Sequence, residues 1–318
     1  MYLSVVVPTY NEQACIAELC SRLNASLPKD RECEIIFVDD GSSDESYRTM
    51  LKMKEQYSTV KVVKLRRNFG KSTALSCGFS VADGDILITI DADLQDDPEE
   101  IPRLVAKHKE GYDVVSGWRQ KREDSLVRVT GSKAFNFMVS KLSGLKLHDF
   151  NCGLKLYSKE VYKKILLYGE QHRLLPMIAY MMGFRVTEMQ VVHHPRKIGH
   201  SKYRAFRFQG LFDLISVFFV YSFQKKPFHI FGLFAIPLFL IGFLIFMGFS
   251  IKHLLFLFTS EARYMIFNRP LFMLSLVLMI LAVQIAFSGL LAELLVNAFH
   301  HLHKDESNII ESVNDIRS

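Results

Sequence analysis

Residues 85–97 read DILITIDADLQDD, an apolar run that ends in a cluster of carboxylates. The run from Ile86 to Ile90 predicts a buried strand, and the acidic residues follow at its carboxyl end. Residues 34–44, EIIFVDDGSSD, repeat this arrangement. Carboxylates at the ends of neighbouring strands repel one another, so we expect a cation between them. A divalent metal that carries a nucleotide diphosphate fits that need.

The rest of the first two hundred residues alternates short apolar runs with helical patterns. Runs at 3–7, 60–65 and 114–115 predict further strands, and segments such as 98–109 predict helices between them. Strands that alternate with helices favour a mostly parallel sheet covered on both faces. We therefore expect a Rossmann-like α/β domain over residues 1–205, on the cytosolic side of a membrane.

Two apolar stretches set the C-terminal part of the chain apart. Residues 228–250 and 270–292 contain no Asp, Glu, Lys or Arg, and each is 23 residues long. About 20 such residues cross a bilayer as a helix. A buried helix of a soluble protein is the alternative, but two such stretches favour a two-span transmembrane hairpin over 227–298.

The segments that flank the hairpin carry more charge. Residues 206–226 are apolar but contain Arg207, Gln209 and Asp213, which favours an amphipathic helix in the membrane interface over a third span. Residues 299–318 are expected to form a cytosolic tail. The hairpin thus predicts a multi-pass protein of the inner or plasma membrane.

Three further observations favour a cytoplasmic catalytic domain with small-molecule partners. The first strand pattern lacks the basic and cleavage regions of a signal peptide. The five cysteines form no CxxC pair and all precede the apolar stretches, which fits reduced thiols. The net charge of +6 is mild, so we expect no nucleic-acid partner.

The Asp91-Ala92-Asp93 string has the pattern of a metal site. Side chains two residues apart on a strand end point the same way, so both carboxylates can hold Mg²⁺ or Mn²⁺ and leave positions for diphosphate oxygens. Gln95 can add another oxygen. The alternative is an acidic loop that caps the helix at Pro98, and the second acidic turn at Asp39-Asp40 favours the functional reading.

Six motifs carry a resemblance to a known family. With these motifs in this order, the chain resembles the inverting family 2 glycosyltransferases of GT-A fold, and more closely the polyprenyl-phosphate sugar synthases. These include dolichyl-phosphate mannose synthase and undecaprenyl-phosphate glycosyltransferases. The motifs lie at residues 8–12, 38–44, 66–71, 91–95, 149–153 and 199–203.

The resemblance implies roles for particular residues. The donor nucleotide would be bound by Pro8, Tyr10, Glu12, Val38, Asp39, Asp40, Asp91, Ala92, Asp93, Arg196 and Lys202. Asp91 and Asp93 with Gln95 would hold the metal and the diphosphate as part of the catalytic set. Arg119 and Arg128 would grip the acceptor or donor phosphates, with Arg122 as a rival for either position.

The resemblance also implies the reaction. A single sugar would pass with inversion from a UDP- or GDP-hexose to undecaprenyl or dolichyl phosphate, for cell-envelope glycan or glycosylation pathways. Two alternatives stay open. The enzyme could glycosylate a lipid hydroxyl, which would need a general base, or the chain could be a non-catalytic membrane-anchored partner subunit. A homo-oligomer is possible in either case.

Overall fold

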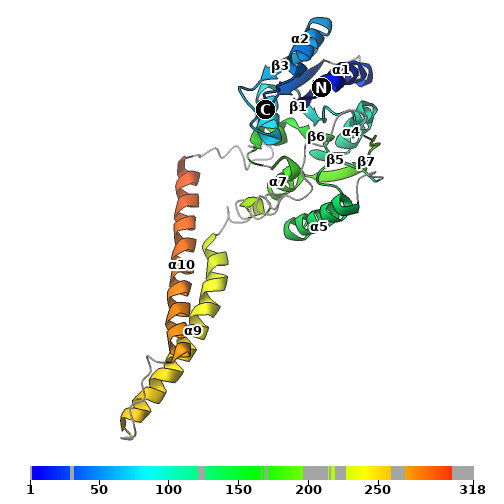
Figure 1. Cartoon of the computed structure of the whole chain (residues 1–318). Helices are drawn as coiled ribbons and strands as arrows, with labels where there is room; N and C mark the ends of the chain where they lie inside the picture. The colour runs from blue at the N-terminus through cyan, green and yellow to red at the C-terminus, as the bar shows by residue number, and fades with distance from the viewer. Residues whose placement is uncertain are drawn as a thin grey trace, which may run out of the picture. The chain divides into compact units, whose positions relative to one another are not determined.

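The computed structural model describes residues 2–28, 32–120, 126–165, 167, 169, 171–195, 214, 216–218, 227–258 and 269–302. The chain forms two compact units, Met1–Tyr221 and Ser222–Ser318 (Figure 1). The first unit contains the strands, and the second contains two long apolar helices.

A mostly parallel sheet forms the centre of the first unit. In the described part of the chain it has seven strands in the order β3-β2-β1-β4-β6-β5-β7. β6 runs antiparallel to both of its neighbours, β4 and β5, and the other pairings are parallel. The strands are β1 (Leu3–Thr9), β2 (Cys33–Asp39), β3 (Val60–Lys64), β4 (Ile86–Thr89), β5 (Val114–Trp118), β6 (Lys155–Ser158) and β7 (Val186–Gln190).

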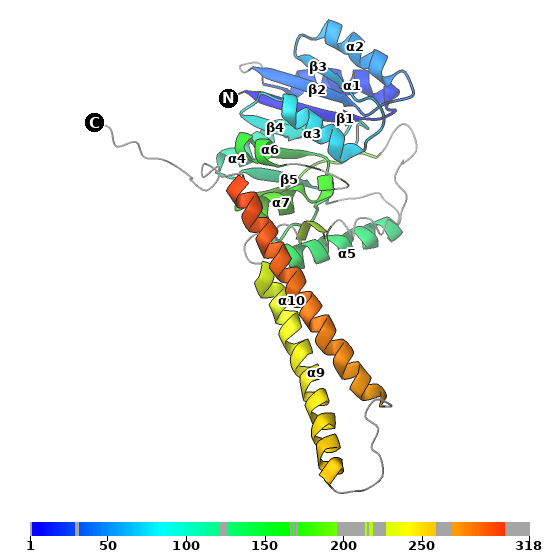
Figure 2. The ribbon, with the colours of Figure 1, turned by 90° about the vertical axis from the view of Figure 1, so that its left-hand side faces the viewer.

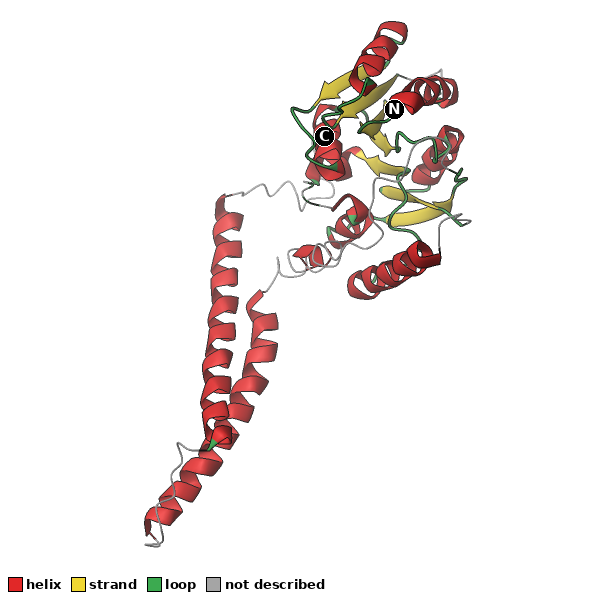
Figure 3. Cartoon of the chain, viewed as in Figure 1, coloured by secondary structure: helices red, strands yellow, loops and turns green. Residues whose placement is uncertain are grey.

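Helices cover both faces of this sheet, as the continuous apolar strands predict. On β1, Val5 and Val7 enter one buried cluster and Val6 enters the other. Helices α1, α2 and α4 pack on the first face, and α3, α6 and α7 pack on the second. Figure 2 shows α3 and α6 in front of the strands, and Figure 3 shows the strands between helices. The bounds are α1 (Gln13–Ser26), α2 (Ser46–Gln56), α3 (Lys71–Val81), α4 (Ile101–Lys109), α5 (Leu126–Ser143), α6 (Lys159–Lys164) and α7 (Leu175–Met181).

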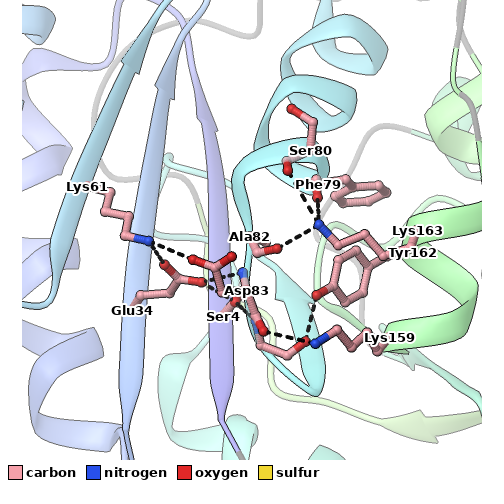
Figure 4. A network of polar contacts seen from close by, with 11 residues as sticks. Ser4, Glu34, Lys61, Phe79, Ser80, Ala82, Asp83, Lys159, Tyr162 and Lys163 are labelled. Carbon is pink, nitrogen blue, oxygen red and sulfur yellow. Dashed lines mark hydrogen bonds and ion pairs between the residues drawn. The ribbon is translucent and has the colours of Figure 1, made fainter.

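A polar network closes the edge of the sheet where β1, β2 and β4 begin (Figure 4). The buried Glu34 accepts a hydrogen bond from Ser4 Oγ at 2.5 Å and pairs with Lys61 Nζ at 2.6 Å. Lys61 also reaches Asp83 at 3.1 Å. On the other side, Lys163 donates to carbonyls at the end of α3. These contacts brace one edge of the sheet.

The second unit is an antiparallel pair of helices, α9 (Pro227–Phe258) and α10 (Pro270–Leu302). The backbone N–H of Phe228, at the start of α9, donates to Glu293, near the end of α10, at 3.1 Å. Phe246, farther along α9, stacks on Phe272 at the start of α10. Both helices are long and apolar enough to cross a membrane, over Phe228–Phe256 and Pro270–Val296. The predicted hairpin is therefore present, with helices that extend beyond both predicted spans.

The described part of the predicted interfacial segment is small. Leu214 and Ser216–Phe218 are helical, and Leu214 and Val217 are buried in the cluster on the α3 side of the sheet. The remainder of 206–226 and the tail beyond Leu302 lie outside the described residues. The interfacial position of 206–226 and the domain limits stay predictions.

Candidate active site

The carboxyl ends of β1 and β2 bring the predicted donor-binding residues together. The parallel register sets Pro8 beside Val38 and Thr9 beside Asp39. The backbone N–H of Asp40 donates to the Thr9 oxygen at 2.8 Å. Since parallel strands end at one edge of a sheet, the turns that follow β1 and β2 adjoin. That edge also holds Tyr10, which is 37% exposed, and Glu12, whose N–H donates to Ser46 Oγ at 3.0 Å.

The acidic turn after β2 is organised by its own carboxylates. Asp39 is fully buried and accepts from the Ser42 N–H at 3.1 Å. Asp40 accepts from the backbone N–H groups of Phe69 and Gly70 at 2.8 and 2.9 Å. Burial of Asp40 raises its pKa despite those two hydrogen bonds, and the nearby Asp39 raises it further. The turn therefore anchors the 66–71 motif against the sheet.

The third neighbouring strand, β4, delivers the metal-type motif to the same edge. Asp91 follows β4, which pairs with β1, and its side chain is 34% exposed. Lys71, at the start of α3, forms an ion pair with the Asp91 carboxylate. Burial alone would raise the pKa of Asp91, but Lys71, with smaller contributions from Arg119 and Lys155, holds it below the usual range. Asp91 is therefore an ionised carboxylate that is paired with the Lys71 ammonium group.

The rest of this turn is held by the segment after β7. Leu94 adopts a left-handed backbone with φ of 60°, and Asp93 accepts from the Gln95 N–H at 3.3 Å. The backbone N–H of His194 donates to the backbone oxygen of Gln95 at 2.8 Å, and the side-chain amide of Gln95 donates to the backbone oxygen of His194 at 3.3 Å. Asp97 then bonds the His194 ring at 2.8 Å. His194 thus supports the acidic turn.

These residues fit a divalent cation that shares its coordination with a substrate. Asp91, Asp93 and Gln95 offer oxygen atoms, which hard cations prefer, and the Lys71 ammonium already occupies a cation position on Asp91. Among the described residues no group of three or more His, Cys, Asp or Glu side chains forms a ready metal cage. A bound ion would therefore need further ligands, such as diphosphate oxygens.

Arg119 supplies a positive charge to the site and is held by an ion pair with Asp149. Arg119 follows β5 and donates twice to the Asp149 carboxylate, at 2.7 and 3.2 Å. Asp149 is 2% exposed and also accepts from the Asn151 N–H at 2.9 Å. Such a two-bond pair fixes the guanidinium plane as well as its position. Arg119 is thus held beside the acidic turn by a buried partner.

The other predicted basic residues are not placed in the site by this structure. Arg128 belongs to helix α5, but its side chain is outside the described part of the molecule. Arg122, Arg196 and Lys202 also fall outside the described residues. Their roles at the phosphates stay predictions.

Three residues of the site were not assigned a role from sequence. Lys71 and Asp149 lie within the motifs at 66–71 and 149–153. Their position next to the ends of predicted elements was the signal that could have assigned them to the site. Lys155 on β6 was missed altogether, although a single lysine inside the apolar run 154–157 is a signal of a buried cation. Burial lowers the pKa of Lys155 to about 8.

Comparison with known proteins identifies the family. Residues 4–166 match the family described as glycosyl transferase family 2. The chain is 34% identical to a dodecaprenyl-phosphate galacturonate synthase of Rhizobium johnstonii, over 99% of this chain and 94% of that protein. The chain belongs to glycosyl transferase family 2. An undecaprenyl-phosphate 4-deoxy-4-formamido-L-arabinose transferase of Klebsiella pneumoniae is 40% identical over 76% of this chain and 73% of its own.

Similarity to a solved structure confirms the predicted fold. Glucosyl-3-phosphoglycerate synthase from Mycobacterium tuberculosis, in complex with Mn²⁺, UDP-glucose and phosphoglyceric acid, has a TM-score of 0.52 at 20% identity. The match covers 69% of this chain and 79% of that one. The predicted resemblance to polyprenyl-phosphate sugar transferases and the predicted GT-A fold are both confirmed, and the family is one of enzymes.

Proposed function

We propose that this enzyme transfers a single sugar from a nucleotide-diphosphate sugar to a polyprenyl phosphate, with inversion at the sugar. The relative of Rhizobium johnstonii, matched over 99% of this chain, carries the proposal. The two apolar helices support it, because a polyprenyl acceptor lies in a membrane. The identity of the sugar and of the nucleotide stays open, as does the oligomeric state.

The donor is proposed to bind at the ends of β1, β2 and β4. Asp39 and Asp40 would take the nucleoside, with Pro8, Tyr10, Glu12 and Val38 around it. The buried Asp39 and its Ser42 contact support this role, since a fixed carboxylate can select the hydrogen-bond donors of a base. Ala92, Arg196 and Lys202 complete the proposed donor set.

The donor diphosphate is proposed to share Mg²⁺ or Mn²⁺ with Asp91, Asp93 and Gln95. When bound, such a cation stabilises the negative charge on a diphosphate leaving group. Lys71 lies on Asp91 and would remain next to the diphosphate. The Mn²⁺ in the structure of the mycobacterial synthase supports a divalent cation in this fold.

The acceptor explains why the site needs positive side chains more than a general base. A phosphate monoester, with a second pKa of about 6, is mostly dianionic at neutral pH and can attack without losing a proton. Two anionic reactants repel, so a fixed cation must lie between them. Arg119, held by Asp149, is proposed for this role, and Arg128 is proposed to assist it.

The second unit is proposed to anchor the enzyme as a multi-pass protein of the inner or plasma membrane. The catalytic unit would then lie on the cytoplasmic side, where soluble nucleotide sugars are available. The lipid chain of the acceptor would stay in the bilayer while its phosphate meets the site at the surface.

A reconstituted assay tests the proposal. Purified protein in vesicles receives Mg²⁺ or Mn²⁺, undecaprenyl or dolichyl phosphate, and a panel of labelled UDP and GDP sugars. We expect one lipid-phosphate-linked sugar, and we expect Asp93→Ala to lower its rate at least a hundredfold, as loss of a charged group at a reacting diphosphate does. Labelling of a lipid hydroxyl or a protein, and none of polyprenyl phosphate, would contradict the proposal.

A further inference from the structure

A row of three buried polar side chains crosses the sheet below the 149–153 loop. The strand register places Thr89 on β4, Lys155 on β6 and Ser116 on β5 side by side. Their exposed fractions are 4%, 3% and 0%. Leu87 and Tyr157, two residues away along β4 and β6, belong to the cluster under α3, α6 and α7, so the row faces that side of the sheet.

All three side chains donate hydrogen bonds to backbone oxygens of the same loop. This loop leads into β6, whose amino end lies at the edge of the sheet that carries the site. The bonds run from Thr89 Oγ1 to Gly153 at 2.8 Å, from Lys155 Nζ to Phe150 at 2.9 Å, and from Ser116 Oγ to Asp149 at 3.4 Å. The row therefore holds the loop by its backbone.

The loop touches both sides of the candidate active site. At one end the Asp149 carboxylate holds the guanidinium of Arg119. At the other end the backbone of Gly153 lies against Asp91, so closely that a Cβ on Gly153 would be 2.5 Å from the carboxyl carbon of Asp91. A shift of the loop would therefore move the partner of Arg119 and the support of Asp91 together.

Lys155 is the unexpected member of the row. A buried ammonium costs free energy that an apolar side chain of similar length avoids, and stability alone does not account for it. Its charge acts on both Asp149 and Asp91, the two carboxylates that the loop joins. A lysine here thus supplies a hydrogen-bond donor and a fixed positive charge under the loop.

We propose that Lys155 is a positioning residue for sugar transfer, which fixes the 149–153 loop so that Asp149 presents Arg119 and Gly153 supports Asp91. Lys155 acts through the loop and touches neither substrate. The expected effect on the rate of sugar transfer rests on the proposed function. The fixing of the loop itself can be measured without any transfer reaction.

The kinetic test compares Lys155→Met with Lys155→Arg. We expect Lys155→Met to lower kcat/KM for polyprenyl phosphate about 10- to 100-fold, the range typical of groups that orient a site residue. Lys155→Arg keeps the charge and the donor and should recover most of this loss. In a background of Arg119→Ala the Met variant should cost less than it does alone, because one of the two residues through which it acts is already gone.

Thiol labelling tests the loop directly. Cys152 lies inside the loop and is 1% exposed, and Cys15 and Cys20, on α1, are similarly buried in the same hydrophobic cluster but outside the loop. We expect Lys155→Met to raise the rate at which a maleimide labels Cys152 about tenfold, measured by mass spectrometry of the peptides, if the loop opens as a local unit. Labelling of Cys15 and Cys20 should not change.

Lys163→Met is the matched control. Lys163 also donates to backbone carbonyls, at 2.8 Å to Ala82 and farther to Phe79 and Ser80, but at the opposite edge of the sheet (Figure 4). Lys163→Met should leave both kcat/KM for polyprenyl phosphate and the labelling of Cys152 unchanged. If Lys155→Met does not fold, Thr89→Val removes one loop bond without removing a charge and should raise labelling of Cys152 by a smaller factor.

The outcomes separate the two proposals. A wild-type enzyme that transfers no sugar to polyprenyl phosphate contradicts the proposed function, and the labelling of Cys152 still decides whether Lys155 holds the loop. Unchanged labelling in Lys155→Met and Thr89→Val, or losses that add fully in the double variant with Arg119→Ala, would overturn the inference.

Discussion

At the scale of single residues, the ion pair of Lys71 and Asp91 places an ammonium where a divalent cation is proposed to bind. The metal must compete with Lys71, so Lys71→Met should tighten Mn²⁺ binding in the absence of donor. We expect the Kd to fall about three- to fivefold, which matches the roughly 1 kcal/mol of a partly exposed ion pair. Titration of Mn²⁺ by electron paramagnetic resonance measures this change.

Lys71→Arg serves as its control, since the competing positive charge is kept and the Kd should stay near that of the wild type. Weaker or unchanged Mn²⁺ binding in Lys71→Met would show that the metal does not use the Asp91 carboxylate that Lys71 now occupies. Asp93→Ala, by contrast, should weaken Mn²⁺ binding in either background.

At the scale of elements, the Glu34–Lys61 pair braces β2 against β3 at the edge away from the site. Burial opposes ionisation of Glu34, but hydrogen bonds from the Asp83 N–H, Lys61 and Ser4 lower its pKa below the usual value. A carboxyl group with a lowered folded-state pKa contributes stability above its unfolded pKa of about 4.3 and loses it as the pH falls through the folded pKa.

Lys61→Met should therefore destabilise the protein at pH 7 and much less at a pH below the lowered folded-state pKa of Glu34. A buried acceptor left without its partner costs about 1–3 kcal/mol, or a few degrees of apparent melting temperature per kcal/mol. Thermal unfolding of the detergent-solubilised protein at both pH values measures the difference. Lys61→Arg should behave as the wild type, and an equal loss at both pH values would contradict the role of the charged pair.

The elements also show what the sequence could and could not predict. The strands at 3–7, 34–38 and 86–90 and the acidic turns were predictable, because apolar runs followed by acids are local signals. The turn at 149–153 before a strand was also predictable, but its position was not, because β6 runs antiparallel and returns Asp149 to the active edge. The ion pairs of Arg119 and Lys71 join residues 30 and 20 positions apart, and no local pattern specifies such a pairing.

At the scale of the whole molecule, the proposed two spans would require both ends of the hairpin to lie on one side of the membrane. The candidate spans are 29 and 27 residues long, against the about 20 that a bilayer needs. Residues 259–268, which connect α9 to α10, should then lie on the side opposite to the catalytic unit. All five native cysteines belong to the first unit, so an added cysteine in the connection reports on the other side.

Ser260→Cys tests this arrangement with a maleimide that does not cross membranes. In intact cells, whose outer surface faces the reagent, we expect labelling of Ser260→Cys and none of Lys54→Cys, a matched position exposed on α2. Inverted membrane vesicles should give the reverse pattern, with the wild type as background. Labelling of both cysteines from the same side would contradict a two-span hairpin, because the single crossing by α9 must place the connection opposite to the catalytic unit.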